Sequence, residues 1–260
     1  MSKLIDKLNQ VAEAVPKPMG FRAAQAVSAK PKILLIASWA ETSNIGRLAD
    51  YTAGADAVLI TKIGPGARTP QKIAQSLSDI PWGLWLGDIG SKGIKPMAEA
   101  GGDFVVFPAS AALALPKDDK AGKVLQIEAS LSEGLLRTVN ELPVDAVLIA
   151  SEPEEKALLT WHHLMLFQRF ADLLTKPLLV SIPLNTTADE LQVLWKTGID
   201  GVVVEVGIGQ PAGRLKELRQ TIDELTFPSR QRKKVEALLP RVAEETVTVT
   251  EEEEEEEEEE

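Results

Sequence analysis

Charged side chains follow several apolar segments of this chain, each at the point where the segment ends. Glu128 closes the segment KVLQIEA, Glu205 follows GVVV, and Lys62 follows AVLIT. Asp88 and Glu152 stand just after two other apolar segments. Carboxylates and an amine gathered at one place can exchange protons with a bound substrate. We therefore predict a catalytic set made of Lys62, Asp88, Glu128 and Glu205.

The alternation of residues along the segments predicts which of these groups point the same way. Gln126 and Glu128 lie on one face of an extended strand, and Leu125 and Ile127 lie on the other. The apolar face must pack on helices, so we expect Gln126 and Glu128 to point inward as a buried pair, which is costly unless hydrogen-bonded. Glu205 shares its face with Val203, whereas the alternation leaves the direction of Lys62 open.

Two kinds of chemistry remain open for this set. Several carboxylates facing one axis could hold Mg²⁺ or Mn²⁺, because hard cations prefer oxygen ligands, and Glu128 and Glu152 are the expected ligands. Alternatively, Lys62 could act as a base or a Schiff-base amine. The structural alternative is an ion pair between Lys62 and a glutamate. His162 and His163 are adjacent within an expected helix, where they do not chelate one ion together.

Glycines and hydroxyls near the last two segments favour an anion site. The loop from Gly207 to Arg214 is rich in glycine and opens a helix, and a helix N-terminus binds phosphate readily. Thr186 precedes another expected helix, and Arg68 stands in a glycine-rich loop that could cover an anion. We predict binding of a substrate phosphate or other anion by Gly207, Gly209, Gly213, Thr186 and Arg68.

The elements that must position these groups form a repeat. A turn, an aspartate and an apolar burst occur four times, in AGADAVLI, AGGDFVVF, LPVDAVLI and TGIDGVVV. Four further apolar bursts alternate with them, in PKILLIA, PWGLWLG, KVLQIEA and KPLLVSI. Eight buried strands with helix-length spacers predict a (β/α)8 barrel. The aspartates Asp56, Asp103, Asp145 and Asp200 precede their strands, which indicates a role in turns at the end opposite the active face.

The segments before and after the repeat divide the chain into three expected parts. Residues 1–30 hold an amphipathic helix, expected to cover the N-terminal opening of the barrel, and a lead-in. Residues 31–242 form the barrel with a C-terminal helix, and residues 243–260 are expected to be a disordered tail ending in ten glutamates.

Composition narrows the class of protein. Ten of the 39 acidic residues form that run of glutamates, so the remaining 29 nearly balance the 28 basic ones. This balance argues against nucleic-acid or membrane partners. The chain has no cysteine, and its N-terminal residues lack the apolar core of a signal peptide, so we expect a cytoplasmic protein. The oligomeric state stays open.

The layout resembles the aldolase-type and phosphate-binding (β/α)8 barrels over roughly residues 31–225. The eight strand segments, the turns of the type Gly-Ala-Asp and the glycines after the eighth segment carry this resemblance. It implies a lyase or isomerase that acts on a small anionic, possibly phosphorylated metabolite at the C-terminal ends of the strands. The sixth segment ends Ala150-Ser151-Glu152, without the lysine that class I aldolases of this kind place there. A non-catalytic barrel that binds a ligand or a protein is the alternative.

Overall fold

Eight parallel strands close into a barrel in the order in which they occur in the sequence. The computed structural model describes residues 2–12, 32–40, 45–62, 69–77, 79–87, 94–112, 121–150, 158–207, 211 and 213–228. The strands are β1 (Leu34–Trp39), β2 (Ala57–Ile60), β3 (Trp82–Trp85), β4 (Phe104–Pro108), β5 (Gly122–Glu128), β6 (Ala146–Ala150), β7 (Leu178–Ile182) and β8 (Gly201–Val206). All eight predicted strands are confirmed.

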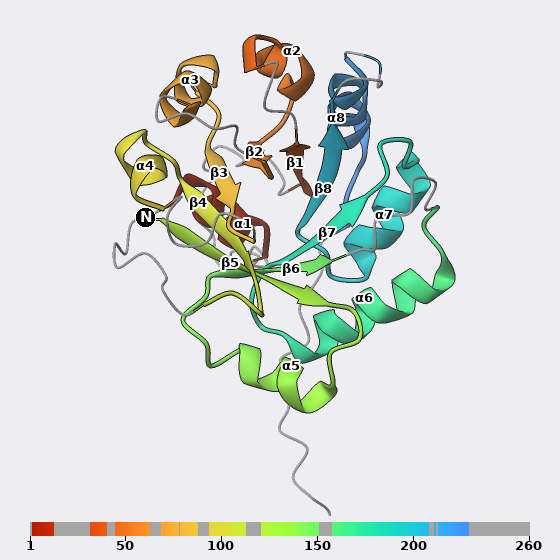
Figure 1. The fold of residues 1–260 in the computed structure, drawn as a ribbon. Coiled ribbons are helices and arrows are strands. Elements are labelled where there is room, and N and C mark those ends of the chain that lie inside the picture. The colour runs from red at the N-terminus through yellow and green to blue at the C-terminus, as the bar shows by residue number, and fades with distance from the viewer. Residues whose placement is uncertain are drawn as a thin grey trace, which may run out of the picture.

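Helices surround the barrel (Figure 1). They are α1 (Lys3–Ala12), the short 3₁₀ turn η1 (Ile45–Arg47), α2 (Leu48–Thr52), α3 (Thr69–Ser76), α4 (Ile94–Glu99), α5 (Glu133–Val139), α6 (Trp161–Leu173), α7 (Ala188–Lys196) and α8 (Arg214–Glu224). The (β/α)8 fold predicted from the sequence is therefore confirmed. None of the helices in the described ranges is long and apolar enough to cross a membrane. The tail after residue 228 lies outside the described residues.

Successive residues of each strand face two different environments. The outward set packs on the helices: Trp39 of β1 meets Tyr51 of α2 with ring centroids 5.6 Å apart. The inward set fills the barrel, where space is short. A Cβ on Gly201 of β8 would lie 2.6 Å from Cδ2 of Leu179 on β7, so a side chain at this inward position would force Leu179 to move.

The register of the strands arranges the inward residues in layers of four, because alternate strands contribute to each layer of such a barrel. The N-terminal part of the interior is filled by small and apolar side chains. One layer holds Ile36, Gly83, Val124 and Leu179, and the next holds Leu59, Val106, Leu148 and Val203. Seven of these eight carry side chains, all apolar and buried, and together they form the core of the barrel.

The repeated aspartates fasten neighbouring strands together. The carboxylates of Asp56, Asp145 and Asp200 accept hydrogen bonds from the backbone N–H groups of Leu35, Lys123 and Leu178 at 2.7–2.9 Å. In each case the backbone N–H of the aspartate donates to the carbonyl of the same partner. Each aspartate thus clamps its own strand to the strand before it, which is the turn role predicted for this motif. Gly54, Gly101 and Gly198 precede β2, β4 and β8 with positive φ, as a helix end followed by a tight turn requires.

Asp103 uses its carboxylate differently. Its backbone N–H donates to Trp82, as in the other repeats, but its carboxylate accepts from Ser2 Oγ and from the backbone N–H groups of Lys3 and Leu4 at 2.7–2.9 Å. It therefore caps the start of α1. The buried side chains of α1 lie at the N-terminal opening, where a Cβ on inward-facing Gly122 would come 2.6 Å from Ile5 Cγ1. The predicted capping helix is confirmed.

Candidate active site at the C-terminal end of the barrel

Toward the C-terminal ends of the strands, polar residues replace apolar ones on the inner face of the barrel. The layer of Leu59, Val106, Leu148 and Val203 is followed, on its C-terminal side, by another layer of four inward-facing residues. This next layer contains Ser38 of β1, Trp85 of β3, Gln126 of β5 and Ser181 of β7. All four are partly exposed, whereas the layer below is buried. We call these four residues the polar layer. It closes the apolar core and is the deepest point of the interior that solvent reaches in the described part of the barrel.

A direct contact confirms that the polar layer is a physical layer. The Trp85 indole N–H donates to Oε1 of Gln126 at 2.5 Å, although β4 lies between the two strands. Gly87 explains how the indole fits, because a Cβ at that position would overlap its six-membered ring. The sequence predicted that Gln126 and Glu128 form an inward pair that needs hydrogen-bonding partners. Gln126 has such a partner, which is Trp85.

Two glutamates stand above the polar layer. Glu205 belongs to the next layer with Thr61, and Glu128 ends its strand one layer higher. Both lie on the inward face, as their phase predicts, yet both are exposed, so the expectation that Glu128 is buried is wrong. Glu128 Oε2 accepts a hydrogen bond from Ser130 Oγ at 3.2 Å. The Glu205 carboxylate has no hydrogen bond or ion pair to any residue that the structure describes.

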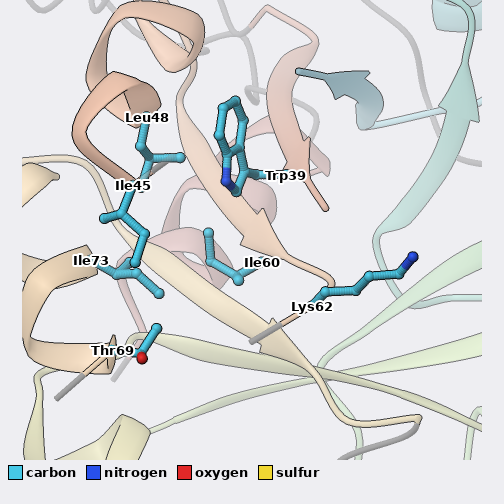
Figure 2. A pocket seen from close by; sticks show the side chains of 7 residues that line it. All are labelled: Trp39, Ile45, Leu48, Ile60, Lys62, Thr69 and Ile73. Carbon is cyan, nitrogen blue, oxygen red and sulfur yellow. The ribbon is translucent and has the colours of Figure 1, made fainter. Parts of the chain in front are cut away.

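Lys62 lies just beyond β2 and is also exposed. It borders a small apolar crevice between the outer face of the barrel and the helices, lined by Trp39, Ile45, Leu48, Ile60, Thr69 and Ile73. Its ammonium group points away from these side chains (Figure 2). The crevice has room for about one water molecule, too little for a substrate. No ion pair joins Lys62 to a glutamate in the described residues, so the structural alternative for Lys62 gains no support.

The residues predicted to bind an anion are only partly placed. Thr186 is buried, and its hydroxyl donates to the Pro183 carbonyl at 2.7 Å, which closes the turn before α7. Gly213 has a φ of 99° at the start of α8, and Gly207 follows β8. Gly209, Arg68, Asp88 and Glu152 lie outside the described residues.

The described residues contain no group of three or more His, Cys, Asp or Glu side chains able to hold a metal ion. Of the two carboxylates predicted as metal ligands, only Glu128 is described. His163 has another role: its side chain completes the capping box with Thr160 that starts α6. A magnesium or manganese site therefore stays a prediction from the sequence.

The sequence prediction missed the polar layer as a unit. Ser38 and Ser181 carry no charge, and Trp85 is ordinary in a buried strand, so none of them stood out. The available signal was the two-residue spacing that puts Gln126 below Glu128 on the same face. Joining four strands into one layer, however, requires the register of the closed barrel.

Comparisons with known proteins support the fold. No protein-family model matches the chain, and no curated protein matches it at a significant level. A variant of the tryptophan synthase α-subunit from the hyperthermophile Pyrococcus furiosus superposes with a TM-score of 0.57 at 13% identity, covering 75% of this chain and 98% of that one. A protein of Aquifex aeolicus VF5 from a structural project gives a TM-score of 0.55 at 14% identity, covering 84% and 96%. These likenesses agree with the (β/α)8 barrel fold.

Proposed function

We propose that the protein is a barrel enzyme of the lyase or isomerase type, acting on a small anionic metabolite at the C-terminal end of the strands. The observation that carries the proposal is Glu205, an inward-facing carboxylate without a described partner, one layer above the polar layer. Because Glu205 is exposed, a ligand bound at the C-terminal mouth of the barrel can reach its carboxylate.

In this proposal Glu205 is the acid–base group. A carboxylate within reach of a bound carbon acid or hydroxyl can take up a proton and return it, which is the step that many lyases and isomerases share. The loop after β8 and the start of α8, with Gly207 and Gly213, would hold the anionic end of the substrate. Lys62 would contact the same end from the rim, and Glu128 would assist from β5.

Deuterium exchange tests the proposed proton transfer without knowledge of the product. A panel of phosphorylated aldoses, ketoses and oxo acids is incubated with the protein in D₂O, and the loss of C–H signals is followed by proton NMR. We expect exchange in at least one compound, and a fall of about 100-fold or more in its rate for Glu205→Gln. Equal exchange rates for the wild type and Glu205→Gln would remove Glu205 from the mechanism.

A second candidate function is a barrel that binds another protein without turnover. The observation in its favour is an exposed apolar surface on α5 and α6, where Trp161 is 82% exposed, Met165 70% and Leu135 55%. Exposed apolar side chains that gather on neighbouring helices mark many interaction sites. Sedimentation at increasing protein concentration tests self-association, with Trp161→Ser as the disrupted variant. Association lost in this variant, together with no exchange in D₂O, would favour the binding protein.

A further inference from the structure

The hydrogen bond between Trp85 and Gln126 fixes the direction of the Gln126 amide. An indole N–H can only donate, so the atom that it meets must be the amide oxygen. The amide nitrogen, with two N–H donors, then points away from Trp85. It makes no hydrogen bond to any described residue, and neither do the hydroxyl groups of Ser38 and Ser181. The polar layer thus offers, from three strands, three hydrogen-bonding groups that no described residue uses.

Trp85 holds this arrangement in place from the other side. Its ring lies over Gly87, where any side chain would displace it. Because β4 contributes Pro108 to the layer above and Val106 to the layer below, no polar residue of β4 competes for Gln126. Trp85 is therefore a positioning residue, and the amide nitrogen of Gln126 is the group that it makes available.

The charges around the polar layer limit what can bind there. The layer contains no cation, and Glu205 stands one layer above it. A carboxylate placed on the layer would bring a second negative charge close to Glu205, and neither of these two layers contains a described cation that would balance it. An apolar end would leave the three polar groups unpaired, which is also costly. A hydroxyl or carbonyl oxygen satisfies these groups and adds no charge.

We propose that the polar layer determines substrate specificity by binding the uncharged, oxygen-bearing end of a small metabolite. Gln126 Nε2 and the hydroxyls of Ser38 and Ser181 bind its hydroxyl or carbonyl oxygens, so the anionic end points out toward the loops. The inference rests on the proposed function in placing the ligand at this end of the barrel. It adds the orientation of the ligand and the exclusion of a second carboxylate.

Four small probes test this specificity by isothermal titration calorimetry. 2-Hydroxyethyl phosphate, phosphoglycolate and ethyl phosphate differ only in a hydroxyl, carboxylate or methyl end, and glycerol carries no phosphate. We expect 2-hydroxyethyl phosphate to bind about tenfold or more tightly than phosphoglycolate and ethyl phosphate. Equal affinities, tighter binding of phosphoglycolate, or no binding of either hydroxyl-bearing probe would overturn the proposal. If glycerol binds and none of the phosphate probes does, the proposed role of the polar layer is supported and the proposed phosphate site is contradicted.

The variant Gln126→Glu separates two roles of this side chain: binding the ligand and accepting the hydrogen bond from Trp85. The new side chain keeps an oxygen for the indole N–H but loses the amide donors, so folding and tryptophan fluorescence should persist while 2-hydroxyethyl phosphate binding falls about tenfold or more. Ser38→Ala, which adds no charge, should weaken the same probe several-fold. Unchanged binding in both variants would show that the layer is only structural. Glu205→Gln should keep binding and lose exchange in D₂O, so the two proposals fail separately.

Discussion

The three aspartate clamps perform the same task in different surroundings. The carboxylate of Asp200 is fully buried and accepts from Leu178 N at 2.7 Å. Asp145 makes the equivalent bond to Lys123 N at 2.8 Å but is exposed. If either carboxylate is removed, a strand N–H loses its partner. Water can replace that partner only at the exposed position, so burial determines the cost.

We expect Asp200→Ala to lower the free energy of unfolding by about 3 kcal/mol and Asp145→Ala by about 1 kcal/mol or less. Urea denaturation of both variants measures the difference. Asp200→Asn, which keeps a side-chain oxygen, is the matched control and should lose less than Asp200→Ala. Equal losses for the two alanine variants would show that burial does not govern the clamps.

Glu128 illustrates how far strand phase predicts a residue. Alternation along the strand indicated correctly that Gln126 and Glu128 share one face. It could not give their depth, because depth follows from strand tilt and from the register of all eight strands. Since Glu128 is exposed, the earlier reason to expect a burial cost disappears.

We expect Glu128→Gln to change the free energy of unfolding by no more than about 0.5 kcal/mol. Thermal melts with and without Mg²⁺ test its predicted role as a metal ligand. A rise in melting temperature with Mg²⁺ in the wild type alone would support that role. The same response in both proteins would argue against it.

At the scale of elements, α8 is fastened to the N-terminal side of the barrel by one arginine. Arg219 donates from Nη1 to Asp56 and from Nη2 to Asp223, both at 2.8 Å, and Lys32 reaches Asp223 at 3.3 Å. Burial pushes the pKa of Asp223 upward, but the hydrogen bonds and charges of Arg219 and Lys32 outweigh it and leave this pKa below its ordinary value of 3.8. Ionised Asp223 therefore stabilises the fold.

A carboxyl whose pKa is lowered in the folded protein stabilises the fold at pH values above its ordinary pKa. This stabilisation disappears as the pH falls through the lowered pKa. We expect Asp223→Asn to cost about 0.5 kcal/mol or less near pH 7, because the side chain is 54% exposed. The difference from the wild type should shrink as the pH falls below 3.8. Chemical denaturation at several pH values measures it, and a difference that grows in acid would contradict the assignment.

Helix starts show which local signals the sequence reveals. Thr187 and Glu190 have the spacing typical of a capping box in the sequence, and the structure shows this capping box at the start of α7. The start of α6 at Trp161 was not predicted, because His163 takes the place of the usual glutamate or glutamine in its capping box. Residues 151–157, which precede this helix, lie outside the described ranges.

At the scale of the whole molecule, the ten C-terminal glutamates dominate the net charge of −11. Like charges at every position repel one another and bury no apolar surface. We therefore expect deletion of residues 251–260 to leave the melting temperature within about 1 °C of the full chain. Differential scanning calorimetry at low and physiological salt measures it, and a loss of several degrees would show that the run docks on the protein.

The carboxylate of Asp103 caps α1 instead of binding a strand N–H group as in the three clamps. This difference affects the order in which contacts can form during synthesis. Residues 2–4 leave the ribosome about 100 residues before their partner Asp103. The start of α1 must therefore wait without its cap while the first clamped pair of strands emerges. Closing this contact fixes a long loop, a slow step in folding. The N-terminal opening of the barrel is thus sealed by a segment that is made before all eight strands, but only after the first three strands have been made.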